Sequence, residues 1–170
     1  GYTASQAIVE GQMPEENLTI VVTYVPTLVK YTVLHKFENL DGTYSEEREE
    51  KEGVFGNQTE AVAKIRNGFE AGIVDNTNIG NNTVIEIEYK RSIYTIRFDS
   101  IGGNYIKAIE KPFGTILDLT TIVPEKQGYN FGGWYLDGKK ITSVTVNNSV
   151  ELTAQWVLKP NQIAKYSVIY

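Results

Sequence analysis

A strand-like pattern recurs three times along this chain, at intervals of roughly sixty to seventy residues. Each copy has a segment rich in β-branched residues that ends on an aromatic side chain, followed shortly by a second strand-like segment that carries a tyrosine. The aromatic-ended segments are 18–25, 83–90 and 150–157, and the tyrosine-bearing segments are 30–37, 93–100 and 165–170. A Gly-aromatic pair precedes each aromatic-ended segment, at residues 1–2, 68–69 and 128–129. The recurrence predicts small modules in tandem.

On this pattern a module opens on the tyrosine-bearing strand and closes on the aromatic-ended strand. The chain then divides into the second half of a module at 1–26, whole modules at 29–91 and 92–158, and the opening strand of a next module at 165–170. The joints at 25–29 and 157–164 each contain a proline, which ends a strand and stiffens a connection.

Each whole module is predicted to be a small, mostly β unit. The dipeptides Asp41-Gly42 and Asp137-Gly138 are typical of hairpin turns. The segment 57–69 has the features of a short helix, because Asn57 can cap it and Glu60 can reach back to the cap. The predicted fold class is therefore α+β and β-dominated, with at most one helix packed on each sheet.

Composition excludes several kinds of partner and site. The net charge is −5 and no segment concentrates Lys and Arg, so nucleic acid is not an expected partner. The chain has no cysteine and one histidine, which removes thiol nucleophiles and cysteine-rich zinc sites. The apolar runs are only a few residues long, so we expect no membrane insertion in this segment.

The most distinctive motifs lie between residues 92 and 157. They are "IYTIRFDSIGG", "KPFGTILDLTTIVPEKQGYNFGGWYLDGKKI" and "NNSVELTAQW", and together they resemble the Listeria/Bacteroides repeat, also called the internalin B-repeat. The module at 29–91, with "YTVLHKFENLDG", resembles the mucin-binding-protein-like repeats. The resemblance implies tandem β-grasp-like modules of an extracellular bacterial surface protein, and it transfers no set of active-site residues.

We therefore expect a non-catalytic segment of a bacterial cell-surface repeat protein, outside the cell at its surface or wall, with modules that act as spacers and adhesion units. The expected partner is a host or matrix protein or a glycan, and we expect no cofactor. The alternative is a carbohydrate-binding appendage of a surface enzyme. We also expect 165–170 to pair as a strand, either head-to-tail with 18–25 of a neighbouring copy or with its own module.

The stretch 127–140 combines four aromatic residues with four glycines. These residues could form either a ligand-binding site or part of the hydrophobic core. Aromatic faces can stack a ligand, but a module of this size needs large side chains to bury enough area. We predict the core role, with Trp156 as a buried closing aromatic and with Gly132 and Gly133 allowing a bend beside an indole.

No catalytic, metal-binding or cofactor-binding residue is predicted. His35 alternates with apolar residues on a strand and has no nucleophile or carboxylate beside it in the sequence, which favours a structural role. The acidic run 45–53 contains interleaved basic residues and is expected to be a solvated face. A calcium-loop spacing starts at Asp75, but Thr77 and Ile79 interrupt its oxygen ligands.

Overall fold

The structure is a computed structural model that describes residues 1–6, 8, 10–12 and 17–160. These residues form thirteen β-strands, and none of them belongs to a helix that could cross a membrane. The chain divides into two compact units, Gly1–Lys90 and Arg91–Tyr170, and each unit has a hydrophobic core of its own.

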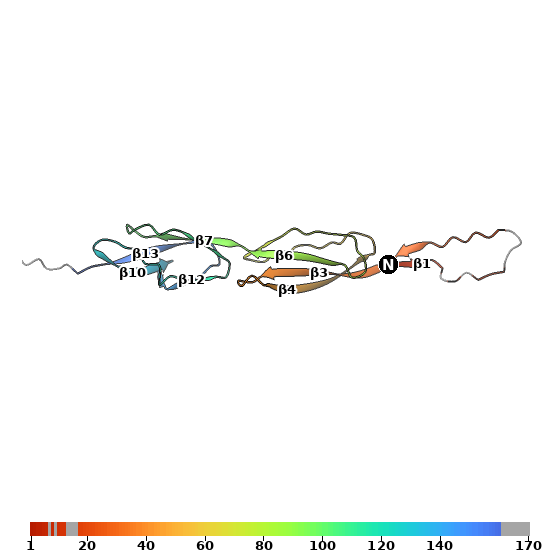
Figure 1. Cartoon of the computed structure of the whole chain (residues 1–170), viewed down its shortest axis with the longest axis horizontal. Coiled ribbons are helices and arrows are strands. Elements are labelled where there is room, and N and C mark those ends of the chain that lie inside the picture. Colours follow the sequence, from red (N-terminus) through yellow and green to blue (C-terminus); the bar gives the residue numbers. More distant parts are fainter. Residues whose placement is uncertain (7, 9, 13–16, 161–170) are drawn as a thin grey trace, which may run out of the picture. The chain divides into compact units, whose positions relative to one another are not determined.

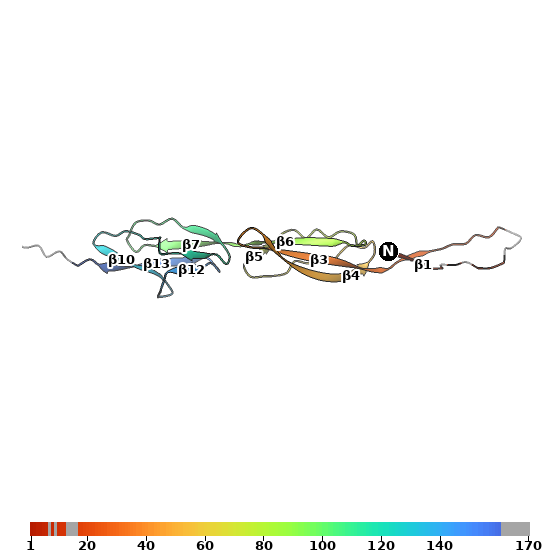
Figure 2. The same ribbon diagram turned by 60° about the horizontal axis from the view of Figure 1, so that its bottom comes forward.

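The first unit contains a four-stranded sheet with the order β4-β3-β6-β5. Its strands are β3 (Leu28–Glu38), β4 (Tyr44–Val54), β5 (Phe69–Ala71) and β6 (Val84–Arg91). β3 pairs antiparallel with β4 along its whole length and parallel with β6, and the three strands lie side by side in Figures 1 and 2. A separate two-stranded sheet pairs β1 (Tyr2–Ala4) with β2 (Tyr24–Pro26).

The predicted Asp41-Gly42 turn connects β3 to β4. Gly42 has a φ of 82°, in the left-handed region that glycine adopts without strain. The Asp41 carboxylate accepts hydrogen bonds from the backbone N–H and the hydroxyl of Thr43, at 3.0 and 2.6 Å. With the register fixed by this turn, alternate residues of β3 and β6 face the core; they are Tyr31, Val33, His35, Phe37, Ile85, Ile87 and Tyr89.

The second unit contains a five-stranded sheet with the order β11-β10-β13-β7-β8 and a two-stranded sheet of β9 and β12. The strands are β7 (Ile93–Asp99), β8 (Ile109–Pro112), β9 (Ile116–Asp118), β10 (Tyr129–Leu136), β11 (Lys139–Ile141), β12 (Ser143–Thr145) and β13 (Val150–Leu158). Asp137-Gly138 forms the predicted turn between β10 and β11, with φ values of 49° and 76°. In this sheet, as in the four-stranded one, the opening and closing strands are parallel neighbours.

The predicted α+β fold class is wrong, because the described chain is all-β. The segment 57–69, predicted as a helix, forms neither helix nor regular strand before β5 begins, apart from an isolated bridge between Gln58 and Asn78. A β-grasp arrangement requires a helix packed on the sheet, so the expectation of β-grasp-like modules is not confirmed either.

Tertiary hydrogen bonds explain why segment 57–69 is not helical. Asn76 Oδ1 accepts a hydrogen bond from the backbone N–H of Ala61 at 2.8 Å, and Asn76 Nδ2 donates to the carbonyl of Ala61 at 3.2 Å. The Tyr31 hydroxyl accepts from the N–H of Glu60 at 3.1 Å, and Lys51 Nζ donates to the carbonyl of Glu60 at 3.0 Å. Asn76 and two residues of the sheet, Tyr31 and Lys51, thus satisfy backbone groups that a helix would pair internally, and these tertiary contacts override local propensity.

The expected closing strand at 18–25 is also largely wrong. Only Tyr24 and Val25 of this segment belong to a strand, β2. Tyr24 is 65% exposed whereas the corresponding Tyr89 is 1% exposed, because a two-stranded sheet alone cannot bury an apolar face. The partner strand expected at 165–170 lies outside the described residues, so its pairing and the division of the chain into repeats stay predictions.

Candidate functional site

The aromatic-and-glycine stretch 127–140 supplies the centre of the second core. Trp134 in β10 is 1% exposed, and its Nε1 donates a hydrogen bond to the carbonyl of Ile122 at 2.6 Å. Its ring makes edge contacts with Phe98 and Phe131, at centroid distances of 5.0 and 5.3 Å. The core role predicted for this tryptophan is confirmed, because the indole is buried and its polar nitrogen has a partner.

Gly132 and Gly133 provide the bend that was predicted beside this indole. The register between β10 and β13 shifts between Phe131 and Gly133, which marks a β-bulge. A Cβ atom on Gly132 would stand 3.0 Å from the carbonyl oxygen of Gln155, and Gly133 has a φ of 128°. Any other residue at either position would press on β13 or strain the bulge.

A surface groove of about 520 Å³ lies where β10 begins and β13 ends. Its aromatic walls are Tyr129, Phe131 and Trp156, and the Lys126 ammonium lies over two of these rings. The Lys126 ammonium is 4.8 Å from the ring centroid of Tyr129 and 5.7 Å from that of Trp156. The remaining lining residues are Val123, Pro124, Glu125, Gln127, Asn130 and Lys159. The groove therefore combines aromatic rings with ammonium, amide and carboxylate groups.

Trp156 is half-buried, so the prediction that it is a buried closing aromatic is only partly right. Its ring packs against the core and lies edge-on to Phe131 at 5.7 Å. Its Nε1 donates a hydrogen bond to the carbonyl of Ser100 at 2.8 Å, which fixes the ring in the wall of the groove. Lys126 Nζ donates to the carbonyl of Ile101 at 2.8 Å and is held over the same wall.

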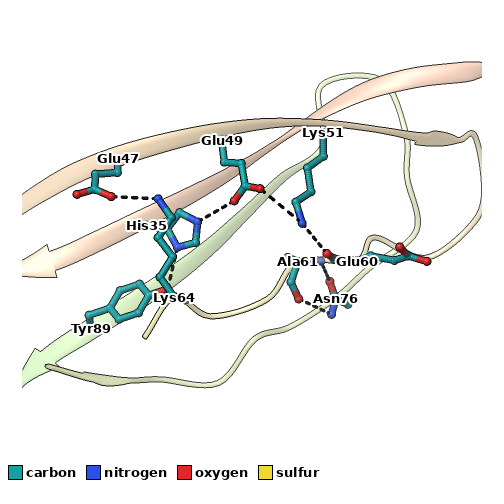
Figure 3. A network of polar contacts seen from close by, with 9 residues as sticks. All are labelled: His35, Glu47, Glu49, Lys51, Glu60, Ala61, Lys64, Asn76 and Tyr89. Atoms are coloured by element: carbon teal, nitrogen blue, oxygen red, sulfur yellow. Dashed lines mark hydrogen bonds and ion pairs between the residues drawn. The ribbon is translucent and has the colours of Figure 1, made fainter. Parts of the chain in front are cut away.

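A second cluster of polar groups surrounds His35 in the first unit (Figure 3). The imidazole is fully buried, with Nδ1 2.7 Å from the Tyr89 hydroxyl and Nε2 3.3 Å from Glu49 Oε2. A carboxylate only accepts hydrogen bonds, so in the neutral imidazole Nε2 carries the proton and the Tyr89 hydroxyl donates to Nδ1. The Tyr89 oxygen also accepts from the backbone N–H of Lys64 at 2.8 Å. The cluster thus ties segment 57–69 to the sheet.

Ion pairs join β4 to the same segment. Lys64 Nζ and Arg66 Nη1 lie 3.0 and 2.9 Å from the carboxylate oxygens of Glu47. The hydrogen bond from Lys64, together with the charge of Arg66, lowers the pKa of Glu47 below its ordinary value. The hydrogen bond from His35, together with the charge of Lys51, lowers the pKa of Glu49 in the same way.

The acidic run 45–53 is the main part of β4, which is an edge strand of eleven residues. Its side chains are exposed or half-buried, as predicted for a solvated face. A long edge strand offers unpaired backbone groups to other chains, and closely spaced charged side chains oppose such pairing. The run therefore protects the edge of the sheet while Glu47 and Glu49 anchor the neighbouring segment.

The loop with a calcium-type spacing serves packing in this structure. Ile79 is buried in the first core, and Glu86 lies on β6, where its carboxylate is 3.1 Å from Lys36 Nζ. Thr77 donates its N–H to the Thr59 hydroxyl at 3.1 Å. Within the part of the chain that the structure describes, no group of three or more His, Cys, Asp or Glu side chains is placed to hold a metal ion.

Sequence reasoning missed the two tyrosine hydroxyls and the amide that organise the first unit. Tyr31 and Tyr89 were assigned to strands, but the backbone N–H groups that their hydroxyls reach come from a segment expected to be helical. Asn76 was assigned to a polar loop, and nothing in the sequence marks it as a partner of Ala61. One sequence feature could have indicated these contacts. Both tyrosines occupy alternating, core-facing positions of their strands, and a buried tyrosine hydroxyl requires a hydrogen-bond partner.

The fold and these sites define a class of protein: small all-β modules, each with its own core, follow one another along one chain. Residues 94–159 match the family model of the Listeria-Bacteroides repeat domain. This match confirms the resemblance seen in the motifs of that stretch. The internalin B-repeat name and the mucin-binding-like assignment of 29–91 are not confirmed and stay predictions.

Two proteins of Evansella cellulosilytica (strain ATCC 21833 / DSM 2522 / FERM P-1141 / JCM 9156 / N-4) are similar to part of the chain. One, named "Putative Gly-rich membrane protein", is 27% identical over 106 residues, which is 59% of this chain and 12% of that protein. The other, named "Putative membrane protein", is 28% identical over 97 residues, which is 54% of this chain and 14% of that protein. The chain thus corresponds to a small part of each relative.

Proposed function

We propose that this chain is a non-catalytic segment of a bacterial cell-surface repeat protein, positioned outside the cell, whose modules act as spacers and present adhesive surfaces. The single observation that carries the proposal is that the most chemically distinctive side chains are committed to structure. Trp134 fills one core, and His35 uses both ring nitrogens within the other. The repeat-domain match and the names of the two relatives support a surface-associated repeat module.

A spacer role agrees with the construction of the two units. Each unit buries its own hydrophobic cluster, so modules can be added along the chain without rebuilding the others. The charged edge strand β4 fits this role as well, because neighbouring copies on a crowded surface must not pair edge to edge.

Surface location is tested on intact bacteria that carry the parent protein. An antibody raised against residues 17–160 should label intact cells, and brief external protease treatment should remove the label. A cytoplasmic protein in the same cells, detected only after permeabilisation, is the control. Labelling that requires permeabilisation would contradict the proposed location.

The groove of the second unit supports a second candidate function, a carbohydrate-binding module attached to a surface enzyme. The parts of the Tyr129 and Trp156 rings that Lys126 leaves uncovered can contact the C–H face of a sugar ring, and the Lys126 ammonium, which lies over both rings, can donate hydrogen bonds to a hydroxyl or carboxylate group. Because Glu125 also lines the groove, the arrangement fits a neutral sugar or an acidic sugar whose polar group reaches Lys126. The spacer proposal has no need of such a ligand, so the two functions are separable by experiment.

A glycan array that includes uronic and sialic acids distinguishes the two functions. The spacer proposal expects flat responses across the array. Saturable binding to one sugar that is lost in Tyr129→Ala and Lys126→Gln would favour the carbohydrate-binding module. Tyr105→Ala and Lys107→Gln are matched controls outside the groove, and binding should survive both.

A further inference from the structure

The parallel pairing of the opening and closing strands affects how each sheet responds to tension along the chain. In the four-stranded sheet, β3 and β6 are paired in parallel from Thr32 opposite Val84 to Phe37 opposite Tyr89, six facing pairs in all. In the five-stranded sheet, β7 and β13 are paired in parallel over four facing pairs, beginning with Ile96 opposite Val150. In both cases the chain comes into the sheet on one strand of the pair and leaves it on the other.

Parallel strands have their starts at one end of the ladder and their ends at the other. The start of β3 and the end of β6 therefore lie at opposite ends of their shared ladder. Tension applied through the chain pulls the two strands past each other, so that all the ladder hydrogen bonds are loaded together. Strands gripped at the same end of a ladder separate one hydrogen bond after another instead.

We propose that each sheet is a mechanical clamp, in which the parallel ladder between the opening and closing strands resists tension along the polypeptide. This inference rests on the proposed spacer function, because a spacer between a cell and whatever it contacts is placed under tension. The clamp requires no ligand and no partner chain. It adds a specific physical property, resistance to stretching, to what a spacer must otherwise do.

Side chains across the first ladder oppose sliding. The Phe37 and Tyr89 rings are stacked with centroids 4.3 Å apart, and the Tyr89 hydroxyl is hydrogen-bonded to His35. On the opposite face, Lys36 Nζ lies 3.1 and 3.7 Å from the carboxylates of Glu86 and Glu88. A slip of one residue would turn the buried side chains toward solvent, and a slip of two would move each by about 7 Å.

The second ladder is shorter but has a reinforcement beyond its last pair. Ile96 and Leu152, which both belong to this ladder, are fully buried. The hydrogen bond from Trp156 Nε1 to the carbonyl of Ser100 ties β13 to the residue that follows β7. With four facing pairs against six, this sheet should yield at a lower force than the four-stranded sheet.

Single-molecule pulling of the full chain tests the clamp directly. The chain contains no cysteine, so two introduced cysteines define the points where force is applied. Leu28→Cys with Ser92→Cys grips opposite ends of the first ladder, and Leu40→Cys with Ser92→Cys grips the same end. Leu28 and Leu40 are both exposed, which makes the two pairs matched.

The clamp predicts a rupture force at least about twofold higher for the opposite-end pair at one loading rate, because the ladder bonds then share the force. The same design is repeated in the second unit, again at exposed positions. Opposite ends of its ladder are gripped by Ile93→Cys with Leu158→Cys, and the same end is gripped by Ile101→Cys with Leu158→Cys. Unchanged circular dichroism and thermal melting show that the variants are folded. Equal forces in the two geometries would overturn the clamp and leave the spacer proposal standing, whereas surface labelling that needs permeabilisation would contradict the spacer without changing any force.

Discussion

Asn76→Ala should destabilise the first unit although its side chain belongs to an irregular segment. Asn76 accepts hydrogen bonds from the Thr59 hydroxyl and the Ala61 N–H, both at 2.8 Å, and donates to the Ala61 carbonyl at 3.2 Å. Ala61 and Thr59 are 4% and 3% exposed, so the truncation leaves buried polar groups without partners. Three groups lose a partner, and an unsatisfied buried group costs about 1 to 3 kcal/mol. At the lower end of that range, about 1 kcal/mol for each group, we expect a loss of about 3 kcal/mol in the free energy of unfolding.

The two tryptophans of the chain make the assay specific for one unit. Trp134 and Trp156 both lie in the second unit, so their fluorescence follows its unfolding alone, whereas far-ultraviolet circular dichroism follows both units. In urea, a loss of about 3 kcal/mol with an m-value of about 1.5 kcal/mol/M lowers a midpoint by about 2 M. The circular dichroism transition of the first unit should shift by this amount, and the fluorescence transition should stay in place.

Asn78→Ala is the matched control, because Asn78 has the same chemistry, lies two residues away and is exposed. It should change the free energy of unfolding by less than about 0.5 kcal/mol. Asn76→Asp keeps the acceptor oxygen and loses the donor, so it should fall between the control and Asn76→Ala. If Asn76→Ala melts like Asn78→Ala, the hydrogen bonds of Asn76 do not hold segment 57–69 in its non-helical conformation.

Three further predictions concern the two cores and the ion pairs. Trp134→Ala should cost about 3 to 5 kcal/mol and the half-buried Trp156→Ala clearly less, measured by urea unfolding followed by circular dichroism. The folded-state pKa values of Glu47 and Glu49 are lowered, so the stability that these carboxylates contribute is present above their unfolded pKa of about 4.5 and is lost as pH falls through the lowered values. Replacing both with Gln should therefore make the free energy of unfolding of the first unit depend less steeply on pH in the acid range. Gly103→Ala should cost about 1 to 3 kcal/mol in the second unit, since a Cβ there would stand 2.6 Å from the Trp156 ring; a parental urea midpoint would contradict this.

The sequence by itself determined the strands whose side chains alternate and the turns that join them. The predicted strands at 30–37, 83–90, 93–100 and 150–157 correspond to β3, β6, β7 and β13, because a period of two is a local property of the chain. The two Asp-Gly turns were equally local. The core role of Trp134 and the solvated character of 45–53 also followed from residue type and spacing.

Tertiary structure alone decided the state of segment 57–69 and the parallel order of the strands. The segment has local helix signals, but Asn76, Tyr31 and Tyr89 bind its backbone, and these partners are distant in sequence. Likewise, the pairing of β3 with β6 joins residues separated by about fifty positions along the chain, and no local pattern encodes it. Local periodicity specifies which residues can face a core, whereas only the folded chain determines which distant groups satisfy their hydrogen bonds and which strands become neighbours.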